Sequence, residues 1–202
     1  MWPLIALTLG ISISGVVAPG PMLVVTLAKS YKSPWAGTFI SLGHAVVEVP
    51  LIALIYFGFA RLLENHTAQL VLAIVGSGML LWMGISLYLA RLKIVREGKD
   101  LPYPAFVAGI IMSALNPFFL LWWATVGSLL VTKFLDFGIH GLFVLIVVHW
   151  ACDLVWLTFI SQFINRTHRF ISPRFQEWLF VVMAFFLVGF GAYYIVSGLR
   201  ML

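Results

Sequence analysis

The sequence predicts an all-α integral membrane protein with six transmembrane helices, arranged as two inverted repeats of three helices each. Of its 202 residues, 62% are hydrophobic and 9% are charged, whereas ordinary soluble domains carry about 25% charged residues. Six apolar segments reach the roughly 20 residues that a helix needs to cross a hydrocarbon core. Helix-breaking prolines and ionisable pairs also recur in the same order in the two halves of the chain.

The six predicted helices leave no part of the sequence for a separate soluble domain. They cover residues 2–28, 34–60, 67–90, 104–132, 137–164 and 175–199. The first three form a predicted repeat at about 1–91 and the last three a second repeat at about 104–202, joined by a basic loop at 91–103. Because each repeat has an odd number of helices, the second copy is expected to insert upside down relative to the first.

The distribution of basic residues predicts the orientation. Nine of the 12 Lys and Arg residues fall in three connections, at residues 29–32, 91–99 and 166–174. Positively charged loops stay on the cytoplasmic side, so both termini are predicted to lie outside a cytoplasmic membrane. The net charge of +5 is then a topology signal that favours contact with anionic lipid and indicates no nucleic-acid partner.

The first and fourth helices are predicted to break at proline. The first contains Pro19, Gly20 and Pro21, and the fourth contains Asn116 and Pro117. A proline inside a helix removes a backbone hydrogen bond and clashes with the preceding turn. Each helix is therefore expected to restart at its last proline, with an N-cap residue just before it. Two such N-termini carry partial positive charge and would bind a carboxylate; the alternative is a simple kink stabilised by packing.

Two pairs of ionisable residues lie in matching helices, at the same spacing. His44 and Glu48 are four residues apart, as are His149 and Asp153, so each pair shares one helix face. A charged side chain at the bilayer centre costs at least about 2.5–3.5 kcal/mol, whereas a polar interhelical contact contributes only about 0.6 kcal/mol. A structural role, in which each histidine bonds its own carboxylate, is therefore the weaker explanation. Three functional roles stay open: binding a substrate ammonium group, carrying a coupling proton, or ligating a transition metal.

Two segments carry a resemblance to a known family. One is GVVAPGPMLVVTLAKS, followed by a basic turn and AGTFISLGHAVVE; the other is SALNPFFLLWWATVG. Over nearly its whole length the chain resembles the LysE/RhtB family of amino-acid exporters. The resemblance implies efflux of amino acids or related small metabolites, driven by the proton motive force. Its motifs match at Pro19, Gly20, Pro21, Asn116 and Pro117, while the histidine and acid pairs are not a hallmark of the best-known members.

The sequence therefore predicts a secondary transporter that exports an amino acid or a related small metabolite. Its half-helix termini would hold the substrate carboxylate. Glu48 and Asp153 would receive the substrate ammonium group or the coupling proton. His44 and His149 would adjust the binding of that proton and relay it. The alternative function is a divalent metal exporter that uses the same four residues as ligands.

Other classes of protein fit the sequence less well. An enzyme is not predicted, because no Ser/His/Asp, phosphate-loop or HExxH pattern is present. No cofactor is expected. The expected partners are a small-molecule substrate and membrane lipids, and a homodimer fits so small a bundle.

Overall fold

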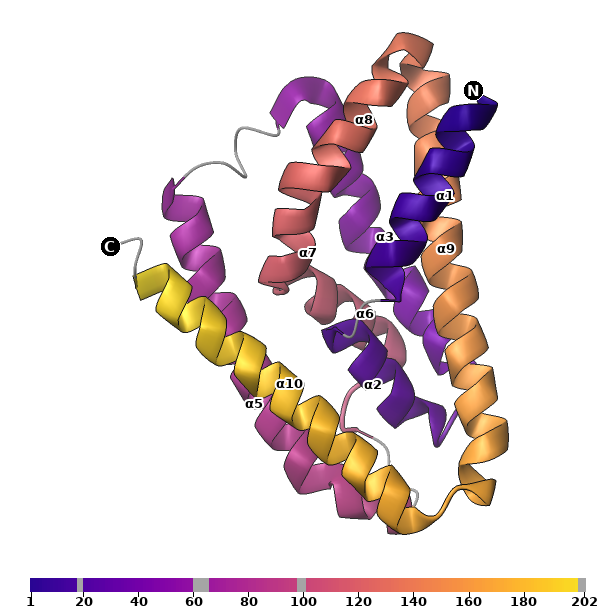
Figure 1. The fold of residues 1–202 in the computed structure, drawn as a ribbon, viewed down its shortest axis with the longest axis vertical. Helices are drawn as coiled ribbons and strands as arrows, with labels where there is room; N and C mark the ends of the chain where they lie inside the picture. The colour runs from indigo at the N-terminus through magenta and orange to yellow at the C-terminus, as the bar shows by residue number, and fades with distance from the viewer. Residues whose placement is uncertain (18–19, 60–65, 98–100, 200–202) are drawn as a thin grey trace.

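The computed structural model describes residues 1–17, 20–59, 66–97 and 101–199, and this part of the chain contains helices and no strands (Figure 1). Four stretches are long and apolar enough to cross a membrane, or five if the bent pair α1 and α2 is counted as one span. The four are Ala36–Gly58, Ile74–Glu97, Pro117–Phe170 and Pro173–Gly198. The all-α class is confirmed, whereas the arrangement of six spans as two inverted repeats stays a prediction.

The described residues of all six predicted segments are mostly helical. The first half of the chain contains α1 (Trp2–Val16), α2 (Pro21–Ser30), α3 (Ala36–Leu54), the short π-helix η1 (Ile55–Phe59) and α5 (His66–Glu97). The second half contains α6 (Ala105–Ala114), α7 (Pro117–Trp122), the π-helix η2 (Trp123–Gly127), α8 (Ser128–Phe134), η3 (Leu135–Phe137), α9 (Gly138–Thr167), η4 (His168–Phe170) and α10 (Pro173–Leu199).

Both helices that were predicted to break at proline do so. Helix α1 ends at Val16 and α2 begins at Pro21, with an angle of 70° between them. Helix α6 ends at Ala114 and α7 begins at Pro117. Proline is tolerated at the first position of a helix, where its missing N–H is not needed, so each break ends where a proline can restart the helix. Pro19 lies outside the described residues.

Helix α3 packs closely against α6, and glycines make this contact possible. A Cβ atom on Gly43 would lie 2.0 Å from the carbonyl oxygen of Phe106, and one on Gly109 would lie 2.0 Å from that of Ile40. No side chain fits at such distances, so only glycine allows the two backbones to approach this far. Because His44 follows Gly43 directly, this contact fixes the position of His44 along the axis of α3 relative to α6.

The cytoplasmic half of α9, in the predicted orientation, is tied to the connection between α2 and α3. Ser161 Oγ donates to the carbonyl oxygen of Pro34 at 2.8 Å, and Asn165 Nδ2 donates to that of Ser30 at 2.7 Å. Side-chain bonds to free backbone carbonyls of this kind anchor one helix against the end of another. They set the position of α9 relative to α3, and with it the position of both ionisable pairs.

Helices α5 and α10 form a separate layer along one side of the molecule (Figure 1). The described part of α5 packs mainly on α10. A Cβ atom on Gly84 would lie 2.9 Å from the carbonyl oxygen of Ala184, and one on Gly191 would lie 3.0 Å from Cγ of Leu81. The close approach of α5 to α10 therefore depends on small residues in both helices. The remaining helices form a second layer, and a cavity lies between the two.

Candidate functional site

The cavity between the two layers has a volume of about 290 Å³ and brings together most of the predicted site residues. Seven of the nine line it: Gly20, Pro21, His44, Glu48, Asn116, His149 and Asp153. Pro117 does not line the cavity and is buried against Gly76 of α5. The predicted convergence of the helix breaks and the ionisable pairs is thus present in the structure, although what these residues bind stays a prediction.

The four ionisable side chains are buried and come from two neighbouring helices. His44 and Glu48 lie on α3, and His149 and Asp153 lie on α9. Each is between 1% and 4% exposed. Buried groups of this kind need partners, because an isolated charge removed from water is strongly destabilised.

Glu48 is the centre of a hydrogen-bond network. Its Oε1 atom lies 2.9 Å from Nε2 of His44, 3.2 Å from Nε2 of His149 and 3.2 Å from Nε1 of Trp123. One carboxylate oxygen therefore accepts from three donors, which belong to α3, α9 and η2. Among the described residues, its other oxygen, Oε2, has no hydrogen-bond partner.

Each histidine is held on its other nitrogen by a serine from the opposite half of the chain. Nδ1 of His44 lies 2.6 Å from Oγ of Ser113 on α6, and Nδ1 of His149 lies 2.7 Å from Oγ of Ser12 on α1. The hydrogen bond on one ring nitrogen decides which proton the other nitrogen carries. Each serine therefore holds its imidazole ring in position from the nitrogen that does not face Glu48.

The bonds of Ser113 assign the proton on His44. The Ser113 hydroxyl donates to the carbonyl oxygen of Gly109 at 2.7 Å, and a hydroxyl has one proton to donate. Nδ1 of His44 must then donate to Ser113. Because Nε2 of His44 lies 2.9 Å from Oε1 of Glu48, a second proton must lie between these two atoms, since two lone pairs would repel. The pair of His44 and Glu48 thus stores one proton and is neutral overall.

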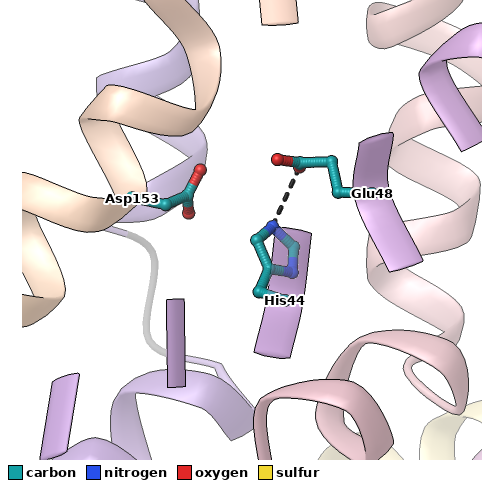
Figure 2. A group of neighbouring side chains, drawn as sticks. All are labelled: His44, Glu48 and Asp153. Carbon is teal, nitrogen blue, oxygen red and sulfur yellow. Dashed lines mark hydrogen bonds and ion pairs between the residues drawn. The ribbon is translucent and has the colours of Figure 1, made fainter. Parts of the chain in front are cut away.

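His149 and Asp153 are arranged differently from the first pair. Nε2 of His149 donates to Oε1 of Glu48 at 3.2 Å, and Nδ1 of the same ring lies 2.7 Å from Oγ of Ser12. Oδ2 of Asp153 lies 3.9 Å from Nε2 of His149, too far for a hydrogen bond, and has no hydrogen-bond partner in the described part of the chain. Figure 2 shows this carboxylate facing the Glu48 and His44 side chains. Asp153 thus lines the cavity with a buried carboxylate oxygen that has no hydrogen bond to the described residues.

The π-helix η2 places Trp123 against Glu48. A π-helical turn inserts an extra residue into a helix and is frequent at functional sites. A Cβ atom on Gly127, at the end of η2, would lie 2.2 Å from the Trp123 ring, so the ring occupies the space above a glycine. Trp123 is fully buried, and its ring lies 4.9 Å from that of His149, edge to face. The turn therefore brings the indole N–H onto the same oxygen that the histidines share.

The two restarted helices differ at their N-termini. In α7 the side chain of Asn116 accepts a hydrogen bond from the backbone N–H of Phe118 at 3.1 Å, so the helix caps itself. In α2 the N-cap is Gly20, and no side chain caps the helix. The first turn of α2 also lies near the network, because Sδ of Met22 is 3.7 Å from Oγ of Ser113. Backbone N–H groups without a cap attract anions, and here they belong to α2.

The comparison with known proteins identifies the family. The model of the LysE type translocator family matches residues 13–198. The chain belongs to this family. The resemblance to this family is thereby confirmed, and the protein is a multi-pass membrane transporter. No curated protein and no solved structure shows a significant match to the chain.

In this LysE type translocator, the sequence prediction missed three members of the network. Ser12, Ser113 and Trp123 each bond a member of the ionisable pairs. Serine and tryptophan are ordinary residues of membrane helices, so neither stands out in an apolar segment. The available signal was position: Ser113 lies one turn before the break at Pro117, and Trp123 lies soon after it.

Proposed function

We propose that this LysE type translocator exports an amino acid or a related small metabolite, with coupling to protons. The supporting observation is the buried carboxylate of Asp153, which is 3% exposed and has an oxygen without a hydrogen-bond partner on the described chain. It lines a cavity of about 290 Å³, which is close to the lower size limit of small-ligand sites. A buried negative charge of this kind requires a cation, and the ammonium group of an amino acid supplies one.

The substrate carboxylate binds at the N-terminus of α2. Helix α2 has ten residues, begins at Pro21 and has no side-chain cap. Its partial positive charge and its unpaired N–H groups stabilise an anion. Gly20 adds no side chain, so a ligand can approach the backbone. Asn116, which also lines the cavity, offers its side-chain NH₂ group, because its oxygen is already bonded to the N–H of Phe118.

The coupling proton moves between the ionisable groups of the cavity. The pair of His44 and Glu48 holds one proton, and Asp153 accepts another whenever the substrate ammonium group is absent. Substrate and proton then alternate at Asp153, which is the exchange that an antiporter needs. One proton that crosses 100 mV supplies about 2.3 kcal/mol. With a single proton per substrate, the membrane potential therefore supports a concentration gradient of useful size.

The cavity lies where an inverted repeat would place it. Transporters built from two inverted repeats bind substrate at the interface between the repeats, next to broken helices. The six helical segments, with breaks in the first and fourth, fit such a repeat, with both termini outside and the basic loops in the cytoplasm. The bonds of His44 to Ser113 and of His149 to Ser12 then link one repeat to the other. A conformational change that separates the repeats would break both bonds.

A divalent metal is the second candidate substrate. One ligand atom each from His44, Glu48 and Asp153 lies within 4.8 Å of the others, and imidazole and carboxylate groups are ordinary ligands of zinc and manganese. A metal ion would have to displace the proton shared by His44 and Glu48. It would also leave most of the cavity empty, which favours the amino acid.

The test is ligand-induced thermal stabilisation of the purified protein, followed by efflux from proteoliposomes. We expect an amino acid to raise the melting temperature and to be exported in exchange for protons. Replacement of both acids, Glu48→Gln with Asp153→Asn, should abolish efflux. Stabilisation by zinc or manganese alone, lost in His44→Ala and His149→Ala, would show that the substrate is a metal. Full efflux by the double variant would overturn the proposed roles of the acids.

A further inference from the structure

The cavity has two chemically different walls. The histidines and carboxylates lie on α3 and α9, whereas the wall formed by the layer of α5 and α10 presents Leu80, Phe190 and Tyr194. Phe118 and Phe119 of α7 also line the cavity, and the Phe119 ring lies 5.0 Å from that of His44. No lysine or arginine occurs among the described residues that line the cavity. A ligand that fills this space therefore has one end in a polar environment and the other against aromatic side chains.

The charge of the polar wall limits the charge of the ligand. His44 and Glu48 compensate each other, and Asp153 has a buried carboxylate oxygen without a hydrogen-bond partner among the described residues. One ammonium group satisfies that site. A second positive charge, as on a lysine side chain, would meet the apolar wall of α5 and α10 instead of a carboxylate. A negative charge, as on a glutamate side chain, would meet aromatic rings and no lysine or arginine, and a buried unpaired charge is strongly unfavourable.

We propose that the cavity selects amino acids with an uncharged, apolar side chain, and that Phe190 forms part of the wall that contacts this side chain. The proposal rests on the proposed export function and specifies its substrate class. The ammonium group pairs with Asp153, the carboxylate lies at the N-terminus of α2, and the side chain packs on α10. Burial of apolar surface against this wall then supplies the selectivity.

The first experiment measures binding of four probes to the purified full-length protein in detergent by isothermal titration calorimetry. The probes are L-leucine, L-alanine, L-lysine and L-glutamate, which share the α-ammonium and α-carboxylate groups. We expect leucine to bind at least about tenfold more tightly than alanine, because each methylene group in an apolar pocket changes affinity about 10- to 200-fold. Lysine and glutamate should bind more weakly than alanine.

The second experiment tests whether Phe190 in the cavity wall determines the preference for leucine over alanine. Phe190→Ala should reduce the ratio of leucine to alanine affinity by about tenfold. The matched control is Phe186→Ala, since Phe186 lies one turn away on the same helix and does not line the cavity. The control should keep the wild-type ratio. A cooperative melting curve for each variant shows that it is folded, so a loss of leucine selectivity reports on the wall alone.

The outcomes separate this inference from the function on which it rests. Preferred binding of lysine or glutamate, or an unchanged ratio in Phe190→Ala, would overturn the apolar selectivity and leave amino-acid export intact. If none of the four amino acids binds and zinc does, both the apolar selectivity and the proposed amino-acid export are wrong. A selective loss of leucine affinity in Phe190→Ala, absent from Phe186→Ala, would support both.

Discussion

The two ionisable pairs have the same spacing and different chemistry. Oε1 of Glu48 accepts from three donors, including His149 of the other pair, while Oδ2 of Asp153 has only a 3.9 Å approach to His149. The duplicated pattern therefore does not produce two equivalent sites. Glu48 thus joins α3, α9 and η2 through its hydrogen bonds, whereas Asp153 lines the cavity with an Oδ2 atom that has no hydrogen-bond partner among the described residues.

The largest expected effect is on stability and concerns Glu48. Glu48→Gln removes the charge that three donors share, and loss of one partner from a buried ion pair costs about 3–5 kcal/mol. We expect the free energy of unfolding, measured by denaturant titration in detergent micelles, to fall by that amount. Asp153→Asn is the matched control, because it removes a charge without a hydrogen-bonded partner and should leave stability unchanged or increase it. Equal destabilisation by the two variants would show that the pairs are equivalent.

For substrate affinity, in contrast to stability, the substitution of Asp153 is expected to have the larger effect of the two acids. Asp153→Asn removes the proposed partner of the substrate ammonium group, and removal of a buried charge partner costs about 2–5 kcal/mol of binding free energy. We expect the affinity for an amino-acid substrate to fall about 30-fold or more, with the protein still folded by its melting curve. Calorimetry on the purified variant measures this change. Wild-type affinity in Asp153→Asn would place the ammonium group elsewhere.

A smaller effect is expected for the indole of Trp123, whose hydrogen bond is to Glu48 of the first pair. Trp123→Phe keeps an aromatic ring and removes the N–H that donates to Glu48, and a hydrogen bond to a charged group contributes about 1.5–3 kcal/mol. Trp156→Phe is the matched control, because its buried Nε1 has no partner among the described residues. Unfolding in detergent should show a loss of stability in the first variant and little change in the second. A comparable loss in both would mean that ring volume, and not the bond to Glu48, is responsible.

The smallest expected effect is the loss of unfolding free energy when either serine is removed, and it should be the same for Ser12 and Ser113. Ser12→Ala and Ser113→Ala each remove one bond to a histidine, worth about 1 kcal/mol, and we expect similar losses of unfolding free energy. Ser14→Ala is the control, since its hydroxyl is exposed and bonds its own helix. A difference above about 1 kcal/mol between the first two would show that the asymmetry of the acids extends to the serines.

Much of the fold was predictable from composition and proline positions. Apolar length identified the six helical segments, and proline chemistry identified the breaks that end at Pro21 and Pro117, because both are local properties of the chain. The site was predictable in part: the spacing of four residues correctly placed each acid beside its histidine on one helix face. The number of membrane spans and their inverted arrangement stay predictions.

The partners across helices were not predictable. The sequence left open whether His149 bonds Asp153 or a group on another helix, and the structure shows Glu48, at 3.2 Å, as the nearer acid. Such contacts depend on the rotation and height of one helix relative to another. These follow from packing at glycines such as Gly43 and Gly109 and from the extra residue of η2, neither of which a linear pattern reveals.

The pairing of α5 with α10 has a consequence for the order of assembly during synthesis. Helix α10 begins at Pro173, roughly 75 residues after α5 ends at Glu97, which corresponds to about 4–15 s at a ribosomal rate of about 5–20 residues per second. During this interval the face of α5 that later meets α10 lacks that partner, although Gly76 of α5 can already contact Pro117 of α7. The wall of the cavity is completed only when α10 has been synthesised and has packed on α5. A nascent chain that stops before α10 is therefore expected to lack Phe190 and Tyr194 of the cavity wall and to bind no substrate.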